Sequence, residues 1–384
     1  MNLLDIPTTG DTQPSIRAQV VTRRTYNRPL NDEGTEFETW EDTVNRVISH
    51  QHWLWERAKE KPLNYAELAE IAELRELMMK RKVLSSGRTL WLGGTEIAKT
   101  REASQFNCAF SRTATVQDAV DHFWLLLQGC GVGSLGAPGV LNGFSKQVQN
   151  INVTRSTRTA NDWQKGNKGR ESNQEEFITG PGGSVTWRLS VGDSAEAWAK
   201  AVGKILAMKR PVDTIILDFS EIRAAGIRLK GYGWISSGDG PVAKAFKAIC
   251  ELLNKKHGRL LSRIDLLDLE NWLGTTLSSR RAAEIVLCPY GDPEWERFAL
   301  AKKDHWETGN EQRVQSNNSL IFDSRPSKAE IYGIFNLMRM AGGSEPGFIN
   351  GEQARARAPW FVGVNPCAEI LLGDKSFCER SQRH

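Results

Sequence analysis

Two cysteines lie close together in the segment VNPCAEILLGDKSFC, which spans residues 364–378. Cys367 stands two residues after Asn365 and two residues before Glu369, and Cys378 follows eleven residues later. A thiol combines a labile hydrogen with facile oxidation, so a cysteine can act as a nucleophile, a redox partner or a one-electron carrier. The neighbouring residues must decide among these three chemistries.

An extended backbone would place the side chains of Asn365, Cys367 and Glu369 on one face of the segment. The carboxylate could then accept a hydroxyl proton, the amide could hold the same hydroxyl, and the sulfur could remove a hydrogen atom from the adjoining carbon. The alternative is that Pro366 merely forms a turn and that Glu369 is solvated. The motif by itself does not choose between these two interpretations.

Histidine, the usual base of a hydrolytic cysteine, does not occur near Cys367 in the sequence. The six histidines stand at positions 50, 52, 122, 257, 305 and 384. Six cysteines in a chain of 384 residues do not form a disulfide framework, and in a reducing compartment those that matter would be catalytic or redox-active. Neither a CxxC pair nor an HExxH motif occurs, so no metal site is predicted.

The composition is that of an ordinary globular protein, with 40% hydrophobic residues and a formal net charge of +4. This charge does not imply binding to nucleic acid or to a membrane, although it suits anionic small molecules. No apolar run approaches the ~20 residues of a membrane span, and the first residues lack the pattern of a signal peptide. We therefore expect a cytoplasmic protein.

Helical periodicity dominates the first hundred residues. Apolar residues recur at helical spacing in 40–60, and Asn64 with Glu67 three residues later predicts the start of a second helix. The glycines of VLSSGRTLWLGG, residues 83–94, break this pattern and predict entry into a barrel or sheet. A further helix is expected over 113–129.

The glycine cluster after that helix matches GxGxxG at Gly131, Gly133 and Gly136. A dinucleotide fingerprint must follow a strand and open a helix, whereas here a helix comes first, so we interpret the match as a false positive. Beyond it, the polar residues 146–176 predict a long exposed loop or a partly disordered segment, which would suit a lid.

The rest of the chain alternates helices with apolar strands. Asp193 and Ser194 can cap a helix, residues 213–220 predict a buried strand, and residues 242–256 predict another helix. This alternation indicates an α/β fold.

The segment NPCAEI strongly resembles the radical-site loop of the adenosylcobalamin-dependent (class II) ribonucleotide reductases. Other stretches agree with that family in order and approximate spacing, namely SGRTLWLGGTE, FNCAF, GCGVG, DFSEIRAAGIRLKGYGWISSGDGP, SSRRAAEI, SNNS and GGSEPGFIN. The proline after Asn365 favours the cobalamin class. The resemblance implies a ten-stranded α/β barrel of the thiyl-radical and glycyl-radical enzyme fold, of which only the first part is present, with an α-helical N-terminal region.

Carried over residue by residue, the resemblance implies that Cys367 becomes a thiyl radical and abstracts the 3′ hydrogen of the ribose. Glu369 would take the proton of the 3′ hydroxyl, which Asn365 would hold. Cys108 would protonate the departing 2′ hydroxyl, and Cys108 and Cys378 would then close to a disulfide as they supply two electrons. The implied activity is reduction of ribonucleotides, more specifically triphosphates, to 2′-deoxyribonucleotides for DNA synthesis, with adenosylcobalamin (the vitamin B12 coenzyme) as cofactor.

A second implied site is the family's loop between a specificity effector and the substrate base. It aligns with Ser236, Ser237, Gly238, Asp239 and Gly240, although a plain turn would use the same residue types. By the same analogy, phosphate recognition by backbone amides is expected near Ser86 or Ser104. Cys250 and Cys288 have apolar neighbours, which predict that both pack in the core, whereas the role of Cys130 stays open.

Members of that family continue for several hundred residues beyond the position of Cys378. We therefore divide the chain into a mainly helical region (1–82), the first part of the catalytic barrel (83–378) and a tail unlike the family (379–384), which we attribute to gene interruption. The expected partners are a ribonucleotide, a nucleotide effector, a thioredoxin-type dithiol reductant and a separate polypeptide that carries the C-terminal half. Two alternatives remain, a catalytically incomplete nucleotide-binding fragment of a split reductase and a thiol–disulfide oxidoreductase with no radical step.

Overall fold

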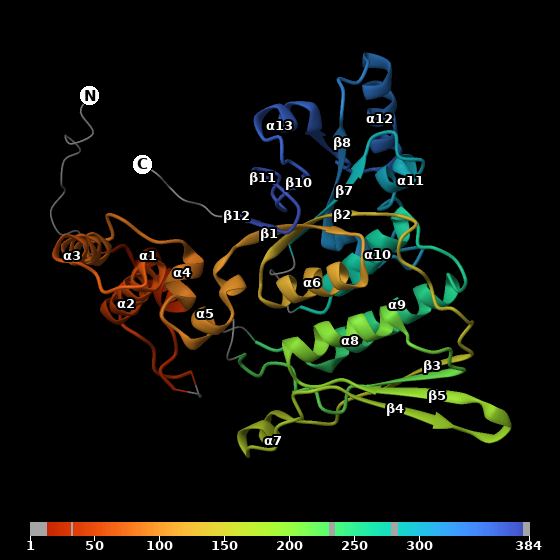
Figure 1. Cartoon of the computed structure of the whole chain (residues 1–384), viewed down its shortest axis with the longest axis horizontal. Coiled ribbons are helices and arrows are strands. Elements are labelled where there is room, and N and C mark those ends of the chain that lie inside the picture. Colours follow the sequence, from red (N-terminus) through yellow and green to blue (C-terminus); the bar gives the residue numbers. More distant parts are fainter. Residues whose placement is uncertain (1–13, 32–33, 230–234, 278–282, 379–384) are drawn as a thin grey trace. The chain divides into compact units, whose positions relative to one another are not determined.

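The computed structural model describes residues 14–31, 34–229, 235–277 and 283–378 (Figure 1). The chain forms two compact units, a first one up to Gln105 and a second one from Phe106 to Glu379. The expected tail, residues 379–384, lies outside the described residues. No described helix has the length and apolar character needed to cross a membrane.

The described part of the first unit is mainly helical, as its periodicity predicts. Its elements are α1 (Ile16–Val21), the π-helical turn η1 (Thr22–Tyr26), α2 (Trp40–Lys59), α3 (Tyr65–Met79), α4 (Gly87–Leu92), α5 (Glu96–Thr100) and the 3-10 turn η2 (Glu102–Gln105). The side chain of Asn64 caps α3 and forms a capping box with Glu67, which confirms the predicted start. Buried Val44 and Val47 of α2 pack with Met78 of α3 and Leu90 of α4.

Residues 83–94 do not enter a sheet, so that prediction was wrong. The Ser86 side chain accepts a hydrogen bond from the Thr89 amide and starts α4, and Thr95 starts α5 in the same way. Local capping therefore continues the helical region, and the glycines between α4 and α5 only separate two short helices.

A six-stranded sheet lies at the centre of the described part of the second unit, in the order β12-β1-β2-β7-β8-β9. Strands β1 to β9 of this order run parallel, and β12 pairs antiparallel with β1. The helices α6 (Val116–Leu127) and α10 (Arg263–Gly274) pack against its strands. The strand bounds are β1 (Cys108–Thr113), β2 (Gly131–Gly136), β7 (Glu284–Pro289), β8 (Ser316–Phe322), β9 (Gly347–Asn350) and β12 (Ser376–Cys378).

Helices follow the last strands of this sheet, namely α11 (Trp295–Ala299) after β7, α12 (Lys328–Ala341) after β8 and α13 (Gly351–Arg357) after β9. Every residue of α10 is buried, including its charged side chains. Charged residues are rarely buried without partners, so each must find one inside the fold. The Asp268 carboxylate, for example, accepts hydrogen bonds from Gln312 and Arg313 of the turn η4 (Glu311–Gln315).

A second sheet has the order β3-β6-β5-β4 and is separated from the first by the helices α8 (Ala195–Ala207) and α9 (Asp239–Lys255) (Figure 1). Ser194 caps α8, as predicted. The predicted strand and helix are confirmed as β6 and α9. The strand bounds are β3 (Asn150–Thr154), β4 (Gln174–Thr179), β5 (Val185–Ser190) and β6 (Thr214–Asp218).

The polar segment 146–176 is not one long loop, so that prediction was wrong. It contains the strand β3, the short helix α7 (Ala160–Gln164) and the beginning of β4. The strand β3 is an edge strand with one exposed face, and β4 is an edge strand whose side chains are mostly exposed, so their sequences lack the apolar residues of a buried strand. The fold as a whole is the mixed α/β arrangement that the sequence predicts.

Candidate active site

Cys108 and Cys378 lie directly opposite each other on β1 and β12. Facing residues of an antiparallel pair point to the same side of a sheet, with Cα atoms about 4.5–5.5 Å apart. A disulfide usually spans Cα separations of about 4.4–6.8 Å. The rings of Phe106 and Phe377, whose centres are 4.5 Å apart, pack next to this pair along the chain. The sheet register therefore holds two thiols from distant parts of the sequence at a spacing that suits a disulfide.

Cys367 lies on the turn between two short paired strands, β10 (Gly363–Val364) and β11 (Leu371–Leu372). The backbone amide of Ala368 donates to the Asn365 carbonyl at 2.8 Å, and Ala368 itself adopts a φ of 61°. This positive φ lies in the left-handed region, which non-glycine residues adopt mainly in turns. The segment is therefore a turn and not the extended strand that would align three side chains on one face.

Asn365 is fully buried in this turn, whereas Cys367 and Glu369 are exposed. The Asn365 Oδ1 atom accepts hydrogen bonds from the backbone amides of Glu369 at 3.2 Å and of Ile370 at 3.0 Å. Its Nδ2 atom is buried, and no described residue accepts a hydrogen bond from it. The amide oxygen thus holds the turn together, and the amide nitrogen is the part of Asn365 left to donate to another group.

The turn lies directly over the glycines of β2. A side chain at Gly133 would collide with the carbonyl oxygen of Val364, and a Cβ atom at Gly131 would stand 2.9 Å from Pro366. From β8, the Asn317 side chain donates a hydrogen bond to the Pro366 carbonyl at 3.2 Å. The glycines of the GxGxxG match thus lie within a strand, and the first two of them make room for the turn.

These contacts bring the three predicted thiols into one region of the second unit. Gly131, on which Pro366 lies, is the register partner of Cys108 in the ladder of β1 and β2. Cys108 is in turn the register partner of Cys378. The region therefore combines an exposed thiol, an exposed carboxylate and a facing pair of thiols, which are the groups needed to activate a substrate and to supply two electrons.

The predicted effector loop lies at the start of α9. The Ser236 hydroxyl accepts a hydrogen bond from the Gly238 amide at 3.0 Å, and the Ser237 hydroxyl donates to the Thr276 carbonyl at 2.8 Å. Burial raises the pKa of Asp239, but hydrogen bonds from Arg155 and the Ser156 amide outweigh this and lower it overall.

Gly240 follows in the first turn of α9, where a Cβ atom would stand 3.1 Å from the Arg155 guanidinium. Asp239 and Gly240 therefore lie against the segment after β3, and Ser237 is held by the chain after α10. Ser236 and Gly238 contact each other and residues 225–227. The Ser237 contact in particular joins the loop to the end of α10, the helix that lies under the six-stranded sheet.

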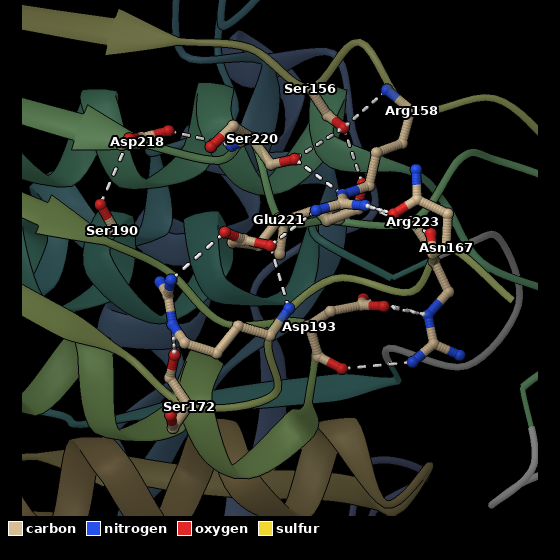
Figure 2. Close-up of polar contacts among 12 residues, drawn as sticks. Ser156, Arg158, Asn167, Ser172, Ser190, Asp193, Asp218, Ser220, Glu221 and Arg223 are labelled. Atoms are coloured by element: carbon tan, nitrogen blue, oxygen red, sulfur yellow. Dashed lines mark hydrogen bonds and ion pairs between the residues drawn. The ribbon is translucent and has the colours of Figure 1, made fainter. Parts of the chain in front are cut away.

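A charged network follows the carboxyl ends of β3, β5 and β6 and borders this loop (Figure 2). Glu221 pairs with Arg158 at 2.8 Å and with Arg170 at 3.2 Å, and Asp193 pairs with Arg223 at 2.9 Å. Sequence reasoning missed these five residues. Four of them carried a signal, an acidic or basic side chain shortly after a strand, since ligands of α/β sheets bind outside the carboxyl ends of strands. Arg170, which precedes β4, carried no such signal.

A cavity of about 130 Å³ lies beside the network and is lined by Asp193, Arg223, Ser236, Ser237 and Thr276, among others. It joins the predicted effector loop to the carboxyl edge of the β3-β6-β5-β4 sheet. Most of its lining is apolar, and the few polar and charged groups can orient a ligand through hydrogen bonds.

The other predicted site residues have partners within their own units. In the first unit, Ser86 caps α4 and Ser104 is buried, with its hydroxyl 3.5 Å from the side-chain nitrogen of Gln105. Cys250 and Cys288 are fully buried in apolar surroundings, which confirms their predicted place in the core. Burial raises the pKa of the Cys288 thiol to about 12.

Cys130, whose role the sequence leaves open, is buried, and its thiol donates to the Phe106 carbonyl at 3.1 Å. Phe106 stands at the start of the second unit, two residues before Cys108. The contact therefore ties the residue before β2 to the segment that enters β1.

A buried polar cluster lies where α6 and α10 meet the six-stranded sheet, and no sequence pattern indicated it. The imidazole Nε2 of His122 is 2.8 Å from Glu284 Oε1, and Ser134 donates to Glu270 at 2.5 Å. Burial raises the pKa of Glu284 and of Glu270 and lowers the pKa of His122, because the interior disfavours charge. Among the described residues, no group of three or more histidine, cysteine, aspartate or glutamate side chains is arranged to hold a metal ion.

Comparison with known proteins gives this arrangement a context. The model of the ribonucleotide reductase alpha domain matches residues 11–95. Adenosylcobalamin-dependent ribonucleoside-triphosphate reductases from Lactobacillus gasseri and Euglena gracilis are 25% and 28% identical to the chain, each over 94% of it. The same enzyme from Lactobacillus leichmannii is 28% identical, again over 94% of the chain.

A crystal structure of a B12-dependent (class II) ribonucleotide reductase has the same fold, with a TM-score of 0.72 over 93% of this chain at 24% identity. The match covers 54% of that structure and 47–53% of the relatives named above, so the chain spans about half of their length. The chain is a homologue of the class II, adenosylcobalamin-dependent ribonucleotide reductases.

Proposed function

We propose that the chain carries the thiol chemistry of a ribonucleotide reductase that converts ribonucleoside triphosphates into 2′-deoxyribonucleotides. The observation that carries this proposal is the facing pair Cys108 and Cys378 beside the turn that presents Cys367. The names of the relatives, which are ribonucleoside-triphosphate reductases, support the triphosphate as substrate.

The exposed side of the turn would act on the 3′ position of the ribose. Cys367, as a thiyl radical, removes the 3′ hydrogen atom, and Glu369 takes the proton of the 3′ hydroxyl. Asn365 supports both steps, because its buried oxygen fixes the backbone of Glu369 while its nitrogen is left to donate to the hydroxyl. The rigid turn thus keeps the thiol and the carboxylate in a fixed relation to each other.

The facing thiols would act on the 2′ position. Cys108 protonates the departing 2′ hydroxyl, which leaves as water, and a disulfide between Cys108 and Cys378 then forms. The two thiols lose two electrons and two protons in total. One proton leaves in the water, and the other and the two electrons enter the new C–H bond at C2′. Cys367 then returns the hydrogen atom to C3′, and Glu369 returns the proton to the 3′ hydroxyl. A thioredoxin-type dithiol would restore the pair for the next turnover.

Adenosylcobalamin is the cofactor that this proposal requires, since the homologues depend on it. When bound, it would supply the one-electron chemistry that converts the Cys367 thiol into a radical. Cys367 would contact the cofactor, and the exposed position of this residue at a turn fits such a contact. Cys250 and Cys288, which are buried in the core, could not be reached in this way.

We further infer that the six-stranded sheet is part of a ten-stranded barrel and that the activity needs the remaining strands. In the described residues, β9 pairs only with β8, so its other edge is open for pairing. Those strands would belong to a second polypeptide or to a further part of the same protein, because the chain spans about half of its relatives.

We also propose that the effector loop binds a nucleotide, with the loop residues Ser236–Gly240 and Arg223 beside the cavity. Gly238→Ala should weaken nucleotide binding, because Gly238 has a φ of 74° and a Cβ atom there would stand 3.0 Å from the Ala225 amide nitrogen. Gly343→Ala is the matched control, since it has open space and no positive φ. Equal binding of a deoxynucleoside triphosphate by both variants would argue against the loop as its site.

The reductase proposal is tested with the chain and a polypeptide that corresponds to the remaining half of a relative. With adenosylcobalamin, a dithiol and a ribonucleoside triphosphate, we expect a deoxynucleotide and exchange of the 3′ hydrogen with solvent. Cys367→Ala should abolish both, whereas Cys378→Ser should stop dithiol-dependent turnover and spare the exchange. Ser376→Ala, on the same strand as Cys378, is the control.

Two other outcomes would favour the alternatives. Disulfide exchange that needs neither the cofactor nor Cys367 would indicate a thiol–disulfide oxidoreductase with no radical step. Nucleotide binding without any turnover in the completed protein would indicate a catalytically silent binding fragment. Either result would overturn the reductase proposal.

A further inference from the structure

A cavity of about 360 Å³ opens between α6, α8 and the hairpin of β4 and β5, within the second unit. It is lined by residues from the start of α6 and the end of α8, whereas the cavity at the effector loop is lined by residues from the opposite ends of these helices. The two cavities therefore share no lining residue. The volume lies in the range of about 300–1,000 Å³ that is typical of small-molecule sites.

The walls of this cavity are apolar and fixed in place. Trp187 is only 2% exposed, its ring stacks with Phe177 at 6.2 Å between centres, and its Nε1 donates to Glu175 at 3.2 Å. A Cβ atom at Gly203 would stand 2.9 Å from Val120, so α8 and α6 come very close at this point. The aromatic wall thus has its polar atom satisfied and presents carbon to the cavity.

The charged residues around the cavity are mostly cationic. Lys200, Lys204 and Lys209 line it, and Glu175 is the single carboxylate among the lining residues. Glu175 already pairs with Lys204 and accepts the Trp187 hydrogen bond. The N-terminus of α6 and the C-terminus of α8 meet here, so their dipoles oppose each other and the lysines set the local potential.

We propose that this cavity binds a small organic anion with a flat apolar body, such as an aromatic sulfonate, carboxylate or phosphate. The ring would lie against the wall of Phe177 and Trp187, and the anionic group would lie near Lys200 and Lys209, which are exposed at the rim. An anion suits the site because Glu175 and Lys204 neutralise each other, whereas a cation would meet the two remaining ammonium groups, those of Lys200 and Lys209. The site is separate from the thiols and from the effector loop.

The probe for this proposal is 1-anilinonaphthalene-8-sulfonate, followed by its fluorescence. It is titrated into the chain in complex with a polypeptide that corresponds to the remaining half of a relative, so that the apolar edge of β9 is covered. The double variant Lys200→Glu/Lys209→Glu should weaken the tightest binding by roughly tenfold or more, since two rim charges are reversed. Ala207→Trp, a change at an exposed residue of the lining, should remove this binding by filling the cavity. Lys255→Glu, on the exposed side of α9, should leave it unchanged.

Circular dichroism of each variant verifies that the fold is kept, and the two kinds of variant act independently. If the charge-reversal and the filling variants both bind the probe as the unmodified chain does, the cavity is not the site and the proposal is overturned. If Lys255→Glu weakens binding as much as the rim variants do, the attraction is a property of the overall charge, and the proposal fails as well.

Discussion

Gly133 of β2 lies against the carbonyl of Val364, the residue that leads into the turn of Cys367. The backbone of the turn can approach the strand this closely only because Gly133 has no side chain. Its φ lies outside the left-handed region, so the requirement for glycine is steric and not conformational. The absence of a Cβ atom at residue 133 therefore allows the position of the turn, and with it that of the Cys367 thiol, more than two hundred residues further along the chain.

Gly133→Ala should displace the turn and lower both stability and activity. We expect a loss of about 1–3 kcal/mol in the free energy of unfolding, as in other overpacked cores, measured by urea denaturation. Gly333→Ala is the control, because a Cβ atom at this position of α12 meets nothing within 4 Å. That change should leave the protein unaffected or stabilise it slightly. Equal stability of both variants would show that the turn does not need this close approach.

The thiols should differ in reactivity according to their positions. Under mild oxidation we expect the disulfide Cys108–Cys378 to form first, because the register already holds these residues opposite each other. Alkylation should modify exposed Cys367 rapidly and Cys288 slowly, since Cys288 is buried and its pKa is raised to about 12. Peptide mass spectrometry measures both. A predominant disulfide between Cys367 and either other thiol would contradict this assignment.

Parts of this arrangement follow from local sequence and parts do not. Asn64 and Ser194 start helices through their own hydrogen bonds, so short sequence patterns identified both. The segments 83–94 and 146–176 were misinterpreted because glycines and polar residues can separate short helices or form exposed edge strands as well as loops. Local patterns therefore did not reveal the short helices in 83–94 or the exposed edge strands in 146–176.

The candidate site shows the same division. The resemblance to a family identified the thiols, but no local pattern shows that Cys108 and Cys378 are neighbours in a sheet. Nor could local patterns show that Gly131 and Gly133 receive a turn from residues 364–366, since that contact depends on packing between distant segments. Asn365 was expected to hold a substrate hydroxyl, which stays a prediction for its nitrogen. No local pattern showed that its oxygen also holds the turn, as a buried polar atom must find a partner.

The buried pair of His122 and Glu284 should make stability depend on pH. Burial raises the folded-state pKa of Glu284, so its favourable contribution is complete below its unfolded pKa of about 4.5 and is lost as the pH rises through the folded value. Burial lowers the folded-state pKa of His122, so its contribution is complete above an unfolded pKa of about 6.5 and is lost as the pH falls.

Glu284→Gln keeps the shape of the side chain and removes its titration. Relative to the unmodified chain, the variant should gain stability as the pH rises above about 4.5, by at most about 1.4 kcal/mol for each pH unit. Chemical denaturation across the range from about pH 5 to about pH 8 measures this. Glu176→Gln, at an exposed position of β4, should show no such trend. If Glu284→Gln instead lowers the free energy of unfolding by several kcal/mol near neutral pH, His122 and Glu284 form an ion pair, and the inference that burial keeps both uncharged is wrong.

The open edge of β9 should bind the strands that complete the sheet. Phe348 of β9 is 40% exposed, and Phe335 of α12 is 49% exposed. Their rings pack edge-on, with centres 5.9 Å apart. Tyr332 of the same helix is 66% exposed. An exposed strand edge next to apolar side chains favours association, so we expect the chain alone to aggregate or to self-associate.

Co-expression with a polypeptide that corresponds to the remaining half of a relative should yield a soluble complex, measured by size-exclusion chromatography. The double variant Phe335→Glu/Phe348→Lys should prevent the complex, since it places charges where the added strand and helix would pack, and it should keep the chain alone in solution. Trp306→Glu, at a 67% exposed residue outside this edge, should still form the complex. A chain that is monomeric by itself and does not bind the second polypeptide would contradict the prediction. The apolar edge of β9 would then be stable in contact with water and would not be the place where the sheet continues.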